Sequence, residues 1–276
     1  MDAAPGSVAV VIPAKDEADR IAATVASARG IPSVDLVVVV DDGSTDATEQ
    51  VARQAGAVVV RHARNRGKAA AMETGAGAVA RSEQSDGGGD RPPRALLFLD
   101  ADLGETAANT APLVPPVLQG QADMTIAVLP KQLSAGGGRG LVVNLSRKGI
   151  VEATGWTPTQ PLSGMRCLTR SAFDAALPLA RGWGVETALT IDLLAQGFRV
   201  LEVPCDLQHR VTGTDLRAQL HRAAQYRDVA RALAVRRARR ALARSRAGRA
   251  LARSRALARS RAGRAAARSR PGRGDG

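Results

Sequence analysis

The stretch VVVVDDGSTD, residues 37–46, joins an uninterrupted apolar run to a turn that carries three carboxylates and two hydroxyls. Four consecutive valines without polar alternation are typical of a strand that is covered on both faces, as in the parallel sheets of α/β proteins. Gly43 allows a tight turn, and Asp46 is a candidate N-cap for a helix over residues 47–55. The stretch therefore predicts a strand, a polar turn and a helix in succession.

The rest of the first 230 residues repeats this order. Together with the strand already described, at residues 36–40, we expect strands at residues 8–12, 58–61, 95–99, 123–129, 165–168 and 198–203. We expect helices at residues 17–28, 68–80, 142–153 and 185–195, and a last one from about Asp215. The alternation predicts an α/β fold whose mostly parallel, Rossmann-like sheet has right-handed crossovers and helices on both faces. Residues 81–94 and 131–140 are polar and rich in Gly or Pro, which predicts surface loops.

The positive charge of the chain is concentrated at its end. From Arg231 to Gly276 there are 16 Arg and one Asp, so this region carries +15 and the remaining residues carry −2 of the total of +13. We therefore expect one α/β domain over residues 1–230 and an Arg/Ala-rich, low-complexity tail over 231–276, either helical or disordered. Such a tail is a candidate for weak contact with anionic membrane or nucleic acid, and the alternative is a solvated tail without a partner.

Cysteine content and hydropathy point to a cytoplasmic protein, peripheral to a membrane at most through the tail. Cys167 and Cys205 are too few for a disulfide framework, and we expect both to be buried and reduced. No apolar run approaches the roughly 18 residues of a membrane span.

Three polar clusters follow predicted strands, where ligands bind in open α/β sheets. They occupy residues 13–17 (PAKDE), 41–46 (DDGSTD) and 100–102 (DAD). The first two can also be explained as helix starts with acidic first turns and N-caps. Capping alone does not require the two further acids Asp41 and Asp42, which favours a ligand-binding role.

Asp100 and Asp102 are the strongest candidates for metal chemistry. Residues two apart on an extended chain project to the same side, so the two carboxylates repel each other unless a cation is present. Mg²⁺ or Mn²⁺ takes oxygen ligands and is commonly bound by one or two carboxylates together with phosphate oxygens. A leaving diphosphate requires such charge neutralisation.

Four other residues are candidates by their surroundings. Lys68 follows Gly67 at a predicted helix start and can reach a phosphate or a ribose. Trp183 offers a flat face to a sugar ring, and Glu186 offers an acceptor for a hydroxyl. His209 follows the last predicted strand and can complete a metal site that Asp102 begins. Each also has an ordinary interpretation, as a solvated or structural side chain. His62 and His221 have no supporting context.

Taken together and in this spacing, the clusters at 13–17, 37–46 and 96–102 and the Gly-Lys at 67–68 resemble the family 2 glycosyltransferases of GT-A fold. The resemblance covers residues 7–230. The second half, with PLSGMRCLTRSAF (161–173) and GWGVETALTIDLL (182–194), resembles the glucosyl-3-phosphoglycerate synthase branch, which is related to the dolichol-phosphate mannose synthases. The resemblance implies metal-dependent transfer of a hexose, glucose, from a UDP-linked donor to a small hydroxylated or anionic acceptor such as 3-phosphoglycerate.

The resemblance also implies roles by position. Donor contacts are expected from Pro13, Ala14, Glu17, an acid of the pair Asp41 and Asp42, Ser44, Lys68, Asp100 and Trp183. Catalytic roles are expected for Asp100, Asp102 and Glu186, metal ligation for Asp102 and His209, and acceptor contacts for Arg139, Glu186 and Arg210. Leu207, Thr212 and the pair Gly140-Leu141 depart from that branch. The acceptor, the anomeric outcome and a possible homodimer therefore stay open.

Two other functions are compatible with parts of the sequence. A sugar-phosphate nucleotidyltransferase shares the general architecture but requires a Gly-rich, Arg-bearing loop after the first strand, and residues 13–17 contain no glycine. A non-catalytic scaffold of transferase type, with a tail that binds nucleic acid or anionic lipid, predicts no cleavage of any nucleotide sugar.

Overall fold

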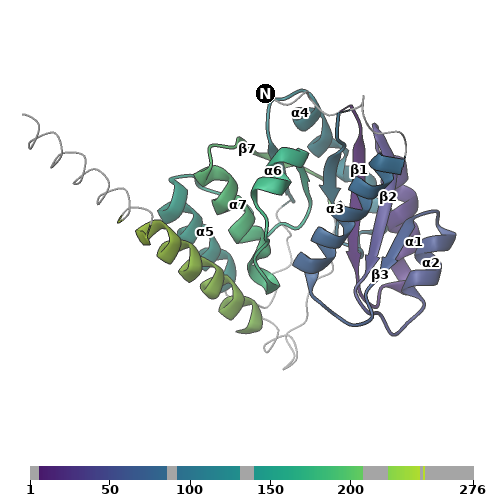
Figure 1. The fold of residues 1–276 in the computed structure, drawn as a ribbon, viewed down its shortest axis with the longest axis horizontal. Coiled ribbons are helices and arrows are strands. Elements are labelled where there is room, and N and C mark those ends of the chain that lie inside the picture. The colour runs from purple at the N-terminus through teal and green to yellow at the C-terminus, as the bar shows by residue number, and fades with distance from the viewer. Residues whose placement is uncertain (1–5, 86–91, 131–139, 208–222, 243–244, 246–276) are drawn as a thin grey trace, which may run out of the picture. The chain divides into compact units, whose positions relative to one another are not determined.

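The computed structural model of the chain describes residues 6–85, 92–130, 140–207, 223–242 and 245 (Figure 1). It divides into a compact unit over Met1–Leu233 and a second unit over Ala234–Gly276. Residues 223–242 are helical. The expected start of this helix near Asp215 lies outside the described residues.

A seven-stranded sheet forms the centre of the first unit. Its strands are β1 (Val8–Ala14), β2 (Val34–Asp41), β3 (Val58–Arg61), β4 (Ala95–Phe98), β5 (Met124–Val128), β6 (Arg166–Leu168) and β7 (Val200–Pro204). They lie in the order β3-β2-β1-β4-β6-β5-β7. Strand β6 runs antiparallel to both of its neighbours, and all other pairs are parallel. The predicted strands are confirmed, with bounds that differ by up to two residues.

Helices cover both faces of the sheet (Figure 1). One face packs on α1 (Ala18–Arg29), α2 (Thr48–Gln54), the 3₁₀ segment η1 (Gly104–Leu113) and α4 (Val114–Leu118). The other packs on α3 (Lys68–Ser85), α6 (Arg170–Ala175) and α7 (Val185–Ala195). Alternate residues of β1 point to opposite faces, Val10 and Ile12 to the first and Ala9 and Val11 to the second, and all four are fully buried. Strand β1 is thus buried on both sides, and the predicted α/β class is confirmed.

Helix α5 (Leu141–Thr154) packs beside α7 and the helical residues 223–233. Ile150, Ile191, Val229 and Leu233 form a third apolar cluster there. Gly149 lies directly against the Leu233 side chain, so this contact has no space for a larger residue.

The structure corrects the predicted loop at 81–94 in its first part. Helix α3 continues to Ser85, because residues 81–85 contain neither Gly nor Pro and the first run of glycines begins at Gly87. Glu83 on this added turn accepts a hydrogen bond from the Arg94 backbone N–H at 2.9 Å and pairs with Arg170 at 3.3 Å. These contacts tie the end of α3 to the start of β4 and to α6.

Both cysteines are buried and free, as predicted. Burial raises the pKa of Cys167 to about 12 and that of Cys205 to about 11, so both thiols stay protonated at neutral pH. Among the described residues, no helix has the length and hydropathy that crossing a membrane requires.

Candidate active site

A cleft of about 620 Å³ opens where the chain leaves the carboxyl ends of β1, β2 and β4. Parallel strands that end at the same edge bring together residues far apart in sequence. Nine of the residues predicted for the site line it: Pro13, Ala14, Glu17, Asp42, Lys68, Asp100, Asp102, Trp183 and Glu186. We refer to this space as the cleft. Asp41 and Ser44 do not line it, and Arg139, His209 and Arg210 lie outside the described residues.

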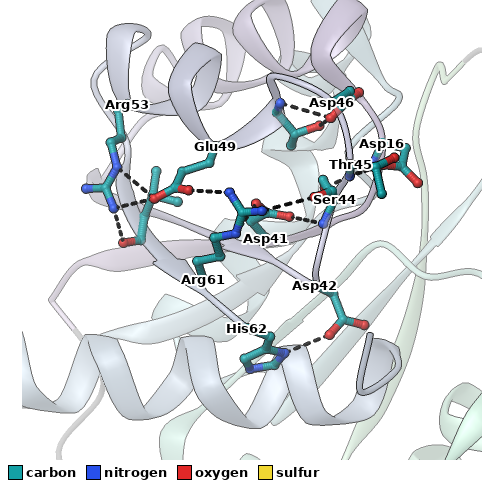
Figure 2. Close-up of polar contacts among 12 residues, drawn as sticks. Asp16, Asp41, Asp42, Ser44, Thr45, Asp46, Glu49, Arg53, Arg61 and His62 are labelled. Atoms are coloured by element: carbon teal, nitrogen blue, oxygen red, sulfur yellow. Dashed lines mark hydrogen bonds and ion pairs between the residues drawn. The ribbon is translucent and has the colours of Figure 1, made fainter. Parts of the chain in front are cut away.

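Hydrogen bonds that involve side chains connect the loop after β1 to the loop after β2 (Figure 2). Asp16 adopts a left-handed backbone conformation, with a φ of 56°. Its N–H donates to Ser44 Oγ at 2.9 Å, and its Oδ1 accepts from the Thr45 N–H at 2.7 Å. The Thr45 N–H bond, assisted by Lys15, lowers the pKa of the Asp16 carboxyl. The hydroxyl of Ser44 is thus one of the groups that connect the loop after β1 to the loop after β2.

The same turn caps the first helix rather than only the second. The backbone N–H of Glu17 donates to Thr48 Oγ1 at 2.8 Å, and that of Ala18 donates to Asp46 Oδ2 at 3.1 Å. Asp46 Oδ1 also accepts from the Thr48 N–H at 3.0 Å, although the N-cap of α2 is Ala47, one residue after the predicted Asp46. Desolvation opposes ionisation of Asp46, but the bonds from Thr48 and Ala18 outweigh it and lower the pKa of the carboxyl. One carboxylate therefore serves the amino ends of α1 and α2.

The adjacent acids Asp41 and Asp42 have different environments. Asp41 is fully buried at the end of β2, accepts from the Ser44 N–H at 2.8 Å, and lies 3.7 Å from Arg61 Nε. Asp42 faces the cleft, and its carboxylate accepts from the N–H groups of Arg66 at 2.8 Å and Gly67 at 2.7 Å. Asp42 is therefore the member of the pair that is placed to meet a ligand.

Lys68, at the start of α3, sits between two carboxylates in the cleft. Its ammonium Nζ lies 2.7 Å from Asp100 Oδ1 and 3.0 Å from Glu186 Oε1. Burial alone would lower the pKa of Lys68, but the Asp100 and Glu186 carboxylates raise it well above its usual value. A permanent cation thus holds the ends of β4 and α7 together, while Asp100 and Lys68 each keep about a quarter of the side chain exposed to the cleft.

Asp102 is the acid best suited to hold a cation. Within the described part of the chain, its carboxylate has no hydrogen bond or ion pair, and it lines the cleft. Its backbone carbonyl accepts from Arg20 Nη1 at 3.1 Å, which anchors the residue without using the side chain. An unpaired hard-oxygen donor at the mouth of an acidic cleft fits a divalent cation. The described residues contain no cluster of three or more His, Cys, Asp or Glu side chains that could hold a metal.

The sequence did not predict the role of Arg166, a buried cation that contacts the backbone of Glu186. Arg166 begins β6 and is only 1% exposed. Its guanidinium donates to the carbonyls of Ser163 at 2.8 Å, Pro161 at 3.2 Å and Glu186 at 3.1 Å. Burial lowers the pKa of Arg166 to about 10, against the pull of nearby carboxylates. A single arginine in an apolar three-residue strand was the only signal in the sequence.

Arg166 joins the loop before β6 to the first turn of α7, and Gly164 of that loop covers the ion pair of Lys68 with Asp100. A Cβ at Gly164 would lie 2.5 Å from Lys68 Nζ and 2.7 Å from Asp100 Oδ1, so a side chain there would force one of these two groups to shift. Trp183, 41% exposed, borders the cleft beside Glu186.

The chain is similar to proteins of one family. The family model described as "Glycosyl transferase family 2" matches residues 9–175. Glycosyltransferase AglJ of Haloferax volcanii is 26% identical over 219 residues, 76% of this chain and 66% of that protein. Glucosyl-3-phosphoglycerate synthase of Mycolicibacterium paratuberculosis is 30% identical over 203 residues, 67% of this chain and 59% of that protein. The chain thus spans about three fifths to two thirds of the length of these relatives.

The fold is similar to that of a crystallised glucosyl-3-phosphoglycerate synthase from Mycobacterium tuberculosis. That structure contains Mn²⁺, UDP-glucose and phosphoglyceric acid. It superimposes with a TM-score of 0.65 at 25% identity, over 83% of this chain and 79% of that one. The match agrees with the expected GT-A fold. The family model covers more than half of the chain, and the chain therefore belongs to glycosyl transferase family 2.

Proposed function

We propose that the protein transfers a hexose, glucose, from a UDP-linked donor to a hydroxyl of a small acceptor, with 3-phosphoglycerate as the leading candidate. The observation that carries the proposal is the convergence of Asp42, Asp100, Asp102, Lys68 and Glu186 on one cleft at the strand ends. The solved relative that binds UDP-glucose and phosphoglyceric acid supports the choice of donor and acceptor.

The nucleoside end of the donor fits beside Asp42. Its two carboxylate oxygens offer about four acceptor positions. Protein donors from Arg66 and Gly67 and one contact from His62 take three of them. The remaining position on Oδ2 can accept one N–H of uracil or one ribose hydroxyl. Pro13, Ala14 and Glu17 form the adjoining wall of the cleft.

The diphosphate fits between this end and Asp102. We propose that Asp102 binds Mg²⁺ or Mn²⁺ and that His209 provides a further ligand. The cation supplies positive charge that neutralises the diphosphate as the bond to the anomeric carbon breaks. Asp100, held by Lys68, faces the sugar and fixes its orientation through hydroxyl contacts.

The acceptor and the sugar fit on the side of Glu186 and Trp183. The Glu186 carboxylate can accept hydroxyl hydrogen bonds, and the exposed indole face of Trp183 can pack on a sugar ring. Arg139 and Arg210 are proposed as cationic contacts to an anionic acceptor. During transfer, the bond from the anomeric carbon to the diphosphate oxygen breaks, a bond to the acceptor oxygen forms, and the hydroxyl proton of the acceptor passes to the leaving diphosphate.

A donor screen tests the proposal. Hydrolysis of UDP-, GDP-, ADP- and dTDP-linked sugars is measured in Mg²⁺ and in Mn²⁺, followed by an acceptor screen with the best donor. We expect UDP-glucose to be cleaved and UDP to bind in Mn²⁺ by calorimetry. The Asp102→Ala variant should lose this binding, whereas Asp174→Ala, an exposed acid on α6 away from the cleft, should keep it. Absence of cleavage with every donor would contradict the proposal and favour a non-catalytic scaffold.

A further inference from the structure

His62 lies directly behind the cleft and has both ring nitrogens engaged. The residue follows β3 and is 6% exposed. Its Nδ1 lies 2.7 Å from Asp42 Oδ1 (Figure 2), and its Nε2 lies 2.9 Å from Thr74 Oγ1 on α3. The histidine therefore connects the loop after β2 to the helix that carries Lys68.

The hydrogen-bond partners fix which nitrogen carries the hydrogen in the neutral ring. Asp42 Oδ1 also accepts from the Arg66 N–H, and an ionised carboxylate has no hydrogen to donate. His62 Nδ1 must therefore carry the hydrogen and donate to Asp42. In the neutral ring, Nε2 is then an acceptor and receives the hydrogen of the Thr74 hydroxyl. The arrangement satisfies every polar atom of the buried side chain without a charge on the imidazole.

The position of Asp42 controls the backbone that leads into α3. Its two oxygens hold the N–H groups of Arg66 and Gly67, the two residues before Lys68. Gly43 packs so closely on the same loop that a Cβ there would lie 2.7 Å from the carbonyl carbon of Arg64. The Asp42 carboxylate is thus the polar connection between the loops after β2 and β3, and His62 is the side chain that orients it.

We propose that His62 is a positioning residue for the donor site. By donating to Asp42 and accepting from Thr74, it orients the Asp42 carboxylate so that one oxygen lone pair faces the cleft. The same carboxylate then holds the backbone of residues 65–67 in the position that directs Lys68 into the cleft. The part that concerns the ligand rests on the proposed function, because it takes a uridine nucleotide as the occupant. The part that concerns the loop is independent of any ligand.

The first experiment needs no ligand. The chain has only three histidines, so ¹⁵N-histidine NMR can separate His62 from the other two. We expect His62 to be the neutral Nδ1–H tautomer. Amide hydrogen exchange at Arg66 and Gly67 should be about tenfold faster in His62→Phe, which keeps a ring but removes both nitrogens, because one charge-assisted hydrogen bond is lost. Exchange near the wild-type rate in a folded His62→Phe protein, or an Nε2–H tautomer in the wild type, would overturn the inference.

Conservative variants separate positioning from simple packing. His62→Asn keeps a donor near the place of Nδ1 and should retain most of the protection of Arg66 and Gly67. His62→Gln places its amide near Nε2 instead and should lose it. If His62→Phe does not fold, Thr74→Val provides the second route, because loss of the hydroxyl should speed the same two amides by a smaller factor. Equal exchange in the Asn and Gln variants, or no effect of Thr74→Val, would count against the proposal.

Calorimetry with UDP in Mn²⁺ tests the ligand part. We expect about tenfold weaker binding for His62→Phe and a smaller change for His62→Asn. In the Asp42→Asn background, His62→Phe should add little, because His62 acts through Asp42. Full additivity would overturn the proposed route. If the wild type itself does not bind UDP, the proposed function fails, while the exchange measurements still decide whether His62 positions Asp42.

Discussion

Lys68 Nζ forms an ion pair of 2.7 Å with Asp100 Oδ1 and thereby joins the start of α3 to the chain that leaves β4. Glu186, 3.0 Å away on the other side, makes the ammonium common to two carboxylates. Loss of the cation would leave the two acids to repel each other inside the cleft.

We therefore expect Lys68→Met to lower kcat/KM for sugar transfer by about 10- to 100-fold, corresponding to about 1–3 kcal/mol for a partly buried charged partner. Lys68→Arg should retain more activity, because it keeps the charge. Steady-state kinetics on both variants, with circular dichroism to check folding, measures the difference. Equal loss in the two variants would show that geometry, rather than charge, is required.

A side chain at Gly164 would press on this ion pair, since its Cβ would lie 2.5 Å from Lys68 Nζ. Gly164→Ala should reduce kcat at least tenfold by displacing Lys68 or Asp100, because small misplacements of catalytic groups are costly. Gly77→Ala on α3 is the matched control, since its nearest neighbour is a flexible arginine end at 3.5 Å. That control should keep full activity and gain about 0.5–1 kcal/mol in stability. Full activity of the Gly164→Ala enzyme would show that the loop before β6 accommodates the methyl group without displacing Lys68 or Asp100.

Capping of α1 from the loop after β2 predicts a long-range effect on stability. Thr48→Val removes the acceptor for the Glu17 N–H and should lower the free energy of unfolding by about 1 kcal/mol. Urea denaturation measures it. The same change should lower donor affinity, because Glu17 and Pro13 line the cleft next to the displaced turn. Unchanged stability would indicate that water replaces the hydroxyl at no cost.

The hydrogen bonds between the loops after β1 and β2 also predict how the stability of the protein depends on pH. The folded protein lowers the pKa of Asp16 and Asp46 below the ordinary value of 3.8, so the unfolded chain binds more protons at low pH. The stabilisation is complete above that value and is lost as the pH falls through the folded-state values. In Asp46→Asn, unfolding free energy measured from pH 6 down to pH 2.5 should decline less steeply than in the wild type. Parallel curves would mean that other carboxyls dominate.

Replacement of Arg166 should destabilise the whole first unit. Arg166→Met would leave the carbonyls of Pro161, Ser163 and Glu186 without their donor in a buried setting, at a cost of about 2–4 kcal/mol. Thr190→Val, which removes a single partner of the guanidinium at 2.8 Å, should cost about 1 kcal/mol. Chemical denaturation compares the two. A smaller loss for Arg166→Met than for Thr190→Val would refute this account.

The tail gives a prediction that depends on charge alone. Truncation after Leu242 removes 11 Arg and one Asp. We expect the shortened protein to keep sugar transfer and to lose retention on vesicles that contain phosphatidylserine, with the retention of the full chain fading as salt rises. Phosphatidylcholine vesicles are the neutral control. Equal retention of both proteins would place any membrane contact outside the tail.

Most of the fold could be predicted because the strands are runs of Val, Leu and Ile with polar clusters directly after them. The region over η1 and α4 could not, since Pro112, Pro115 and Pro116 break the helical period and the segment is ordered by packing on β5 and α1. Prolines in the first turn are tolerated in α4 because the missing N–H would have no partner there.

The acids of the cleft were visible in the sequence because they follow apolar strands. Their supporting residues were not, because support depends on neighbours that are distant along the chain. No feature of the local sequence distinguishes Asp41, which is buried and accepts from the Ser44 N–H, from Asp42, which faces the cleft. His62 gained a role only when folding placed Thr74 and Asp42 on its two sides.

The reversed direction of β6 has a consequence for how this architecture can be altered. In the parallel strands, the loops at the cleft leave the strand, whereas at β6 the loop enters it, so Gly164 precedes the strand whose first residue is Arg166. The sides of the cleft that we propose for the nucleotide and for the sugar are thus built from chain segments of opposite polarity. A change of length before Pro161 would reshape the sugar side while β1, β2 and β4 keep their register. For protein engineering, we expect changes before Pro161 to leave the nucleotide side undisturbed only where Gly164, which packs on Lys68 and Asp100, is kept.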